Sequence, residues 1–243
     1  MKTTLAHQKH PKVLVIDIGG SNVKFAVFGS DVKRKFKSGP SLTPGRMVKE
    51  VLAATRDWQY DVISIGFPGP VHEGKPVGAP KHLGRGWAGF DYRGKFKKPV
   101  KLINDAAMQA LGSYTGGRML FIGLGTGFGS AFISQDILIP LELCNLPYTD
   151  GKSIEDFLCK ESLKMIGKQK WQVLVHDVVE QFKASFITDY IVIGGGNAKH
   201  LVPPLPKGVK LGHNENALLG GYRLWNVKPG RHRKFINDAW VVA

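Results

Sequence analysis

The 243-residue chain is long enough for one large domain or for two small lobes that each have an apolar core. Its composition, 43% hydrophobic and 22% charged, is that of an ordinary folded protein and excludes a collagen-like or disordered chain. The 34 Lys and Arg residues against 19 Asp and Glu give a net charge of +15, which favours an acidic partner: nucleic acid, an anionic surface or a polyanionic substrate.

The basic residues are spread over residues 33–37, 95–101, 160–170 and 231–234, and no arginine-rich or basic-aromatic RNA motif stands out. The charge therefore indicates polyanions in general, with a merely solvated basic surface as the open alternative. We expect neither nucleic acid nor a membrane as partner.

Several features bear on the cellular compartment. No apolar run approaches the roughly 20 residues that span a bilayer. Residues 1–11 are polar and lack the apolar centre of a secretory signal. Cys144 and Cys159 form no CxxC pair, so neither a disulfide framework nor a structural zinc site is indicated. We expect a cytoplasmic protein.

The first half of the chain is typical of an α/β unit. Residues 12–28 predict a β-hairpin and residues 32–37 a more polar edge strand. Thr43 followed by Pro44 predicts a helix start, and residues 61–66 and 98–103 predict two strands. The Gly/Pro-rich stretch up to about residue 94 is too long for an ordinary connection, and such loops are usually functional.

The second half repeats this order. We expect a hairpin over residues 118–133, a strand at 136–140 and a helix capped by Ser153. A helix over 171–186, a strand at 189–193 and a last helix near 215–225 follow. The last helix contains Gly220-Gly221, an interruption that requires a packing or ligand reason. The repeat predicts two related α/β lobes with a cleft between them.

A glycine-rich turn occupies the same place in each half: DIGGSNVK at residues 17–24 and GLGTGFG at residues 123–129. Hairpin turns made mostly of glycine expose backbone N–H groups, and such clusters bind phosphate. Asp17 is expected to orient Mg²⁺ or its waters, although Asp and Gly also form turns without a ligand. We predict phosphate contacts from Asp17, Gly19, Gly20, Ser21, Lys24, Gly125, Thr126 and Gly127, with a solvent-facing Lys24 as the alternative.

Three common nucleotide motifs do not fit. A G-x-G-x-x-G fingerprint fails because its sixth position falls on Ser130 or Phe128 and the turn leads into a strand. A P-loop ending in Gly151-Lys152-Ser153 would have its first glycine at Leu146. Protein-kinase signatures are absent from the sequence.

Asn104-Asp105 follows an apolar strand and starts a helix, so Asp105 is either a helix cap or a catalytic group. Its position between two phosphate turns favours catalysis, because phosphoryl transfer needs a carboxylate to accept the proton of the attacking hydroxyl. Glu142 and Glu155 suit a sugar site, because a carboxylate bridges two vicinal hydroxyls, or they are surface residues. His82 fits the same site, and Trp87 is either a stacking platform or core.

Together these segments resemble the sugar kinases of the ROK family, and among them the polyphosphate glucokinases, over about residues 12–225. The matching pieces are DIGGSNVK (17–24), GFPGP (66–70), IND (103–105), GLGTG (123–127), LPY (146–148) with Glu155-Asp156, DYIVIGGGNAK (189–199) and GGYRLW (220–225).

The resemblance implies a two-lobed ribonuclease H-like fold of the hexokinase, actin and Hsp70 type with an interlobe cleft. It implies that Asp105 is the general base. Sugar ligands are implied at Asn104, Glu142, Asn145, Glu155 and His82, and the nucleotide or distal phosphates at Gly195, Gly196 and Asn197.

Two positions depart from the family pattern. The sugar-binding Glu-x-Gly-His reads Glu142-Leu-Cys-Asn145, and the Asn expected five residues before Trp87 is His82. The family's Cys-rich zinc motif is also missing, as it is from the polyphosphate-type members. Both changed positions belong to the sugar pocket, so phosphoryl transfer is better supported than glucose as acceptor.

We therefore expect an Mg²⁺-dependent sugar kinase that transfers phosphate from polyphosphate, ATP or both to the primary hydroxyl of glucose or a related hexose. A smaller lobe over 1–104, a larger lobe over 105–226, residues 227–243 packed back on the first lobe, and a homodimer are expected. One alternative is a sugar-sensing regulator of this family, although such regulators carry a helix-turn-helix where this chain has eleven polar residues. The other is a degenerate sugar-binding protein.

Overall fold

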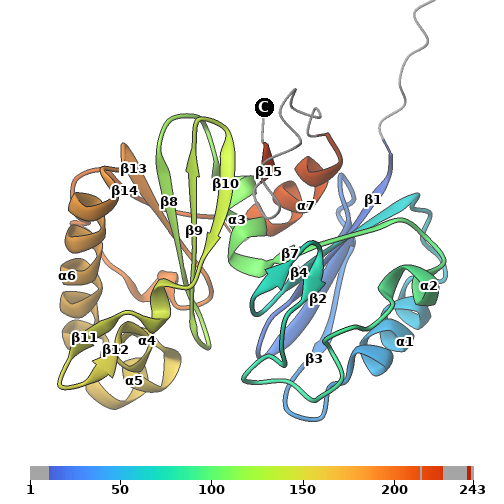
Figure 1. Cartoon of the computed structure of the whole chain (residues 1–243), viewed down its shortest axis with the longest axis horizontal. Helices are drawn as coiled ribbons and strands as arrows, with labels where there is room; N and C mark the ends of the chain where they lie inside the picture. Colours follow the sequence, from blue (N-terminus) through green and yellow to red (C-terminus); the bar gives the residue numbers. More distant parts are fainter. Residues whose placement is uncertain (1–10, 214, 227–239, 242–243) are drawn as a thin grey trace, which may run out of the picture.

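The computed structural model describes residues 11–213, 215–226 and 240–241, which form two β-sheets with helices α3 and α7 between them (Figure 1). Further helices cover the outer face of each sheet. Among the residues described, no helix is long and apolar enough to cross a membrane.

The first sheet has the strand order β3-β2-β1-β4-β7. Its strands are β1 (Val13–Ile18), β2 (Asn22–Val27), β3 (Lys33–Lys37), β4 (Val62–Phe67) and β7 (Val100–Asn104). The first three strands are antiparallel, and β4 and β7 run parallel to β1, as the predicted hairpin, edge strand and two further strands require. Helix α1 (Pro44–Ala54) starts as predicted, with the Thr43 hydroxyl accepting the N–H of Arg46.

The second sheet has the order β14-β13-β8-β9-β10-β15. Its strands are β8 (Met119–Leu124), β9 (Phe128–Ser134), β10 (Ile137–Leu141), β13 (Tyr190–Gly194), β14 (Val209–Leu211) and β15 (Trp240–Val241). Without β15, the second sheet has the same topology as the first, with β10-β9-β8-β13-β14 in the places of β3-β2-β1-β4-β7. Each sheet consists of an antiparallel hairpin with a third strand, followed by two parallel strands. The predicted repeat of one α/β unit is confirmed.

The remaining elements lie outside the two sheets. They are α2 (Tyr92–Phe96), α4 (Ile154–Leu158), α5 (Lys160–Ile166), α6 (Lys168–Phe186), two short hairpins formed by β5 (Val71–His72) with β6 (Lys75–Pro76) and β11 (Pro147–Thr149) with β12 (Lys152–Ser153), and the 3₁₀ turns Leu143–Asn145 and Ala198–His200. The Asp156 carboxylate accepts from the N–H and the hydroxyl of Ser153, so Ser153 begins α4 as predicted.

The long stretch after β4 is more ordered than the sequence suggested, because it contains the β5–β6 hairpin and leads into α2. Trp87 in this stretch is fully buried, and its ring centroid lies 5.7 Å from that of Phe67. Of the two alternatives for Trp87, the structure selects core.

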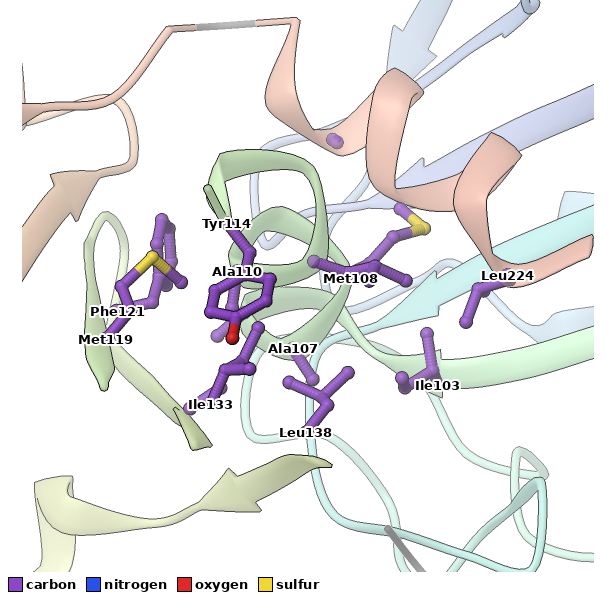
Figure 2. Close-up of a cluster of buried hydrophobic side chains, with 14 of the residues drawn as sticks. Ile103, Ala107, Met108, Ala110, Tyr114, Met119, Phe121, Ile133, Leu138 and Leu224 are labelled. Carbon is purple, nitrogen blue, oxygen red and sulfur yellow. The ribbon is translucent and has the colours of Figure 1, made fainter. Parts of the chain in front are cut away.

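Helix α3 (Asp105–Ser113) contributes to an apolar core that both lobes share. Figure 2 shows Ala107 and Ala110 of α3, and Tyr114 directly after it, gathered with side chains of β8, β9 and β10, while Met108 points toward α7. Ile103 and Leu224 extend the same cluster into the first lobe. The two sheets are therefore joined by packed side chains.

Helix α7 (Asn216–Asn226) crosses α3 at a pair of glycines. A Cβ added at Gly220 would lie 1.7 Å from the carbonyl oxygen of Met108, and one at Gly112 would lie 1.8 Å from that of Asn216. On its other side α7 meets β1, where a Cβ at Gly221 would lie 2.4 Å from Val15. Close packing against α3 and β1 thus explains the Gly220-Gly221 interruption.

The division of the chain at residues 104 and 105 coincides with the passage from β7 into α3. Residues 227–239 and 242–243 of the expected C-terminal segment lie outside the described residues. Trp240–Val241 pair with β10, and so these two residues extend the second sheet.

We predict that Gly220→Ala destabilises the protein, although Ala is favoured over Gly in a helix by about 1 kcal/mol. The added methyl overlaps backbone, and overpacking typically costs 1–3 kcal/mol, occasionally more. The midpoint of thermal unfolding should fall by roughly 2–4 °C per kcal/mol. Gly78→Ala, with open space around its Cβ position, is the matched control; equal melting of the two variants would contradict the packing account.

Candidate active site

A cleft of about 720 Å³ opens between the two lobes, and every site residue predicted from the sequence lines it. These residues are Asp17, Gly19, Gly20, Ser21, Lys24, His82, Asn104, Asp105, Gly125, Thr126, Gly127, Glu142, Asn145, Glu155, Gly195, Gly196 and Asn197. They come from seven different segments of the chain, which the fold brings together in one cleft.

Two carboxyl groups lie on the cleft wall at the ends of buried strands. Asp17 is near the end of β1, and Asp105 is the first residue of α3, directly after β7. Desolvation by the surrounding protein and, second, the negative charge of Asp17 raise the pKa of Asp105 to about 8. Desolvation also raises the pKa of Asp17, partly offset by Lys24.

The side chains of Asn104 and Asp105 make different hydrogen bonds at the start of α3. The side chain of Asn104 caps α3, because its Oδ1 accepts the N–H of Ala107 at 3.0 Å, and its Nδ2 donates to the carbonyl of Gly69 at 3.1 Å. Asp105 Oδ1 accepts from the next N–H, that of Ala106, at 2.8 Å. Its carboxyl therefore keeps its other oxygen available to the cleft, whereas much of the bonding capacity of Asn104 is already used.

The two glycine turns meet across the cleft. The hydroxyls of Ser21 and Thr126 are 3.4 Å apart, and a Cβ at Gly20 would lie 3.1 Å from the Thr126 side chain. A side chain at position 20 would push on Thr126, which would have to move by a few tenths of an ångström. Gly20 thus allows the two turns to approach closely across one cleft.

The GGGN segment after β13 supports the second turn. Asn197 donates from its backbone N–H to Leu124 O at 2.9 Å and from Nδ2 to Gly125 O at 2.8 Å. Gly195 has φ +84°, and a Cβ there would lie 2.3 Å from Leu124 O. Asn197 thus has a clear structural role in shaping the turn, beside any contact it makes to a ligand.

Lys24 shares the face of Asp17. The two residues lie directly opposite each other in the β1–β2 ladder, and directly opposed residues point to the same side of a sheet. Lys24 is exposed and lines the cleft, which is consistent with both alternatives for it, a phosphate contact and a side chain that faces solvent.

The predicted sugar residues gather with one residue that the sequence analysis missed. Glu142 precedes the 3₁₀ turn before β11 and Asn145 is its last residue, Glu155 lies in α4, and His82 comes from the first lobe. Lys81 beside His82 forms an ion pair with Glu155, which raises the pKa of Lys81. This ion pair joins the two lobes across the cleft. The one indication of Lys81 in the sequence was its position next to His82, a predicted site residue.

Further polar residues of the cleft wall also escaped prediction: Asn22, Gln109, Lys160, Lys199, His200 and His213. Lys160 begins α5, and Lys199 and His200 follow the GGGN segment. Asn22 and Lys199 belong to the quoted segments DIGGSNVK and DYIVIGGGNAK, and Lys160 to the basic stretch at residues 160–170, but none of the three was named as a site residue. Gln109, His200 and His213 belong to no motif.

The carboxylates fit a magnesium ion that is shared with phosphate. Within the described part of the chain, no group of three or more His, Cys, Asp or Glu side chains is arranged to hold a metal. Mg²⁺ is commonly held by one or two carboxylates together with water and substrate phosphates, so the carboxyl of Asp17 beside the two glycine turns would be enough to hold it. The mutual repulsion of Asp17 and Asp105 also favours a cation nearby.

Two curated relatives match part of this chain. The chain is 27% identical over 136 residues to a glucokinase of Pyrobaculum calidifontis and 24% identical over 205 residues to a polyphosphate glucokinase of Mycobacterium leprae. These matches cover 53% and 74% of this chain but 45% and 62% of the relatives, so the chain matches only part of their length.

Two solved structures share the fold. The inorganic polyphosphate/ATP-glucomannokinase of Arthrobacter sp. strain KM superposes with a TM-score of 0.76 at 24% identity, covering 88% of this chain and 97% of that one. A ROK family glucokinase from Streptomyces griseus, in complex with glucose and AMPPNP, gives 0.68 at 16% identity, covering 87% and 98%. They establish the two-lobed hexokinase and actin type of fold.

The family model described as "ROK family" matches residues 13–140, the segment that carries the first sheet, α3 and the second glycine turn. That segment is more than half of the chain, and the chain belongs to the ROK family.

Proposed function

We propose that this protein is a sugar kinase that transfers a phosphoryl group from ATP, polyphosphate or both to the primary hydroxyl of glucose or a related hexose. The observation that carries the proposal is the carboxyl of Asp105, which lines the cleft between two facing glycine turns and has a pKa raised to about 8. A general base works best when its pKa lies near the working pH.

The reaction is one in-line displacement. The hydroxyl oxygen of the sugar attacks the terminal phosphorus, the bond to the leaving phosphate oxygen breaks with its electron pair, and Asp105 takes the hydroxyl proton. The N–H groups of Gly19 and Gly125 donate within their own turns, to Asn22 O and Gly127 O, so the backbone N–H groups of Gly20, Thr126 and Gly127 are the ones that would stabilise the charge of the transferred and leaving phosphates. Mg²⁺, held by Asp17 directly or through water, supplies further neutralisation of that charge.

The charges along the cleft support one orientation of the substrates. Glu142 and Glu155, the latter beside Gly127 of the second turn, are acidic residues on the second-lobe side of the cleft, and Lys24 lies beside Asp17 on the first-lobe side. A phosphate chain is repelled from the carboxylates, which instead suit vicinal hydroxyls. We infer that the acceptor sugar occupies the end near Glu142 and Glu155 and that the donor occupies the end near Lys24.

The choice of donor draws on the relatives and on net charge. One curated relative is named a polyphosphate glucokinase and one solved neighbour a polyphosphate/ATP-glucomannokinase. The net charge of +15 suits a polyanion. Sugar binding without turnover is the competing function, favoured by the departures at His82 and Asn145, and the first assay below separates the two.

In a panel of hexoses with ATP or polyphosphate and Mg²⁺, we expect phosphorylation of glucose or a close relative. Asp105→Asn should lower turnover by about 10²–10⁴-fold, the usual effect of removing a general base. Sugar binding measured by calorimetry should persist in that variant. Near-normal turnover would make Asp105 a structural residue, and a panel without product would favour the binding protein.

The same variant should be more stable than the wild type at neutral pH. The folded pKa of Asp105, about 8, exceeds its unfolded value, so its contribution to folding is lost as pH rises from about 4 to 8. The loss is at most about 1.4 kcal/mol per pH unit, and less because the carboxyl keeps some solvent contact.

Thermal melts in EDTA should therefore show Asp105→Asn gaining several degrees over wild type at pH 7.5 and little at pH 4.5. Asp31→Asn, in an exposed turn, makes the same chemical change as a control and should show no such trend. A pH-independent difference for Asp105→Asn would contradict the desolvated carboxyl.

Two substitutions test the acceptor pocket. Asn145 is shorter than His, and His82 is larger than Asn, so we expect a raised KM for glucose or a preference for another hexose. Because both residues line one cleft, His82→Asn together with Asn145→His should improve kcat/KM for glucose by more than the product of the single effects. Strictly multiplicative effects would show that the two positions act on separate sites.

A further inference from the structure

The sheet face that carries Asp17 continues outward as a row of lysines. Register places Lys24 of β2 opposite Asp17 of β1, and Lys35 of β3 opposite Lys24. Lys37 lies opposite Asn22, which lines the cleft. Neighbouring strands are about 4.8 Å apart, so the backbone of Lys35 lies roughly 10 Å from that of Asp17.

This lysine face looks toward the second lobe. At its other end Phe28 stacks on Tyr222 of α7 with ring centroids 4.0 Å apart, and Lys33 forms an ion pair with Glu215 just before α7. The opposite face of β3 carries Arg34 and Phe36, which are engaged by Trp58 and Phe25. Because side chains alternate along a strand, Lys33, Lys35 and Lys37 of β3 all lie on the face that is turned toward the second lobe.

The end of β3 is fixed to the first phosphate turn. Ser38 donates from its hydroxyl to Gly19 O at 2.6 Å and from its N–H to Ser21 O at 3.1 Å. Lys35 and Lys37 are exposed, and within the described residues no carboxylate pairs with either, whereas Lys33 and Arg34 each have an acidic partner. Two uncompensated cations therefore stand beside the turn that faces the donor.

We propose that Lys24, Lys35 and Lys37 form a track, the β3 track, that binds the distal phosphates of a long polyphosphate while its terminal phosphates occupy the glycine turns. This inference rests on the proposed function, and it adds the residues that distinguish a long chain from a short one. ATP ends within the cleft, so its few phosphates do not reach Lys35 and Lys37.

A single-stranded nucleic acid fits this track less well. Proteins that bind single strands place aromatic rings where successive bases stack. Here Phe36 faces the other side of the sheet and Phe28 is covered by Tyr222. The track offers charge at regular strand spacing without a stacking surface, which suits a bare phosphate polymer.

The test is direct binding of tripolyphosphate and of long-chain polyphosphate to the full chain, by calorimetry at several salt concentrations. Lys35→Ser with Lys37→Ser should weaken binding of the long chain by about 3- to 30-fold, the sum of two exposed charge contacts. The salt dependence, the slope of log K against log salt, should become less steep by about 1.4, or 0.7 per contact, as for single-stranded polyanions. Tripolyphosphate binding should not change.

The matched control removes the same charge from the other side of the lobe. Lys49→Ser with Lys95→Ser, at exposed positions of α1 and α2, should leave long-chain binding unchanged, and Lys35→Arg with Lys37→Arg should retain it. If the Lys49/Lys95 and Lys35/Lys37 variants lose the same affinity for long-chain polyphosphate, general charge attraction and not a specific track explains the binding. Equal losses for short and long chains would place these lysines at the terminal phosphates.

Two further outcomes would overturn the track: a wild-type protein that binds long and short chains with equal affinity, or one in which an oligodeoxynucleotide of matched charge competes as well as polyphosphate. Binding is measured without a sugar and without turnover. If the protein phosphorylates no hexose but still binds long polyphosphate more tightly than short, the proposed kinase function is wrong while the β3 track is supported.

Discussion

The close crossing of α3 and α7 is the contact on which the rest of the molecule depends. Glycines at 112 and 220 let the two backbones touch, and Gly221 lets α7 lie on β1. Ser64 of β4 then donates to the carbonyl of Gly221 and accepts from the indole of Trp225, which anchors α7 to the first sheet. Because α3 packs at the same time on β8 and β9, both sheets share one core. Without this crossing, Asp17 and the second glycine turn would have no fixed relation.

The site built on this core is costly in electrostatic terms. Asp17 and Asp105 are both desolvated, and the charge of Asp17 opposes ionisation of Asp105. Such an arrangement lowers stability at neutral pH, and a protein that needed only a folded core would place apolar or neutral side chains here. Strain of this kind concentrates at functional sites, where a group must be held in a protonation state that water would not give it. The same pair of carboxyls explains why a cation and a phosphate chain would bind together.

Much of the fold and many of the residues that line the cleft were predictable, because short sequence segments determine glycine turns, strand ends and helix caps. The turns at residues 17–24 and 123–129, the strand ending at Asn104 and the cap at Ser153 each follow from short segments. What depends on register was not predictable. The ion pair of Lys81 with Glu155, the burial of Trp87 and the common face of Lys24 and Lys35 arise only when distant segments pack. Net charge favoured a polyanion, and the surface proposed to bind it became visible only from the strand pairing.

The two lobes contact each other at two places of different strength: the polar contacts across the cleft, here called its mouth, and the packing of α3 on α7, here called its base. Across the mouth the lobes meet through the hydroxyls of Ser21 and Thr126 and through the exposed ion pair of Lys81 with Glu155, contacts worth about 1 kcal/mol or less each. At the base, α3 and α7 are packed backbone to backbone and surrounded by buried apolar side chains. Opening the mouth therefore costs little compared with separating the base, and a ligand can shift this balance only by binding the closed form better. In the proposed function, phosphates seated between the two glycine turns would contact both lobes at once, and this would give the donor the differential affinity that closure requires.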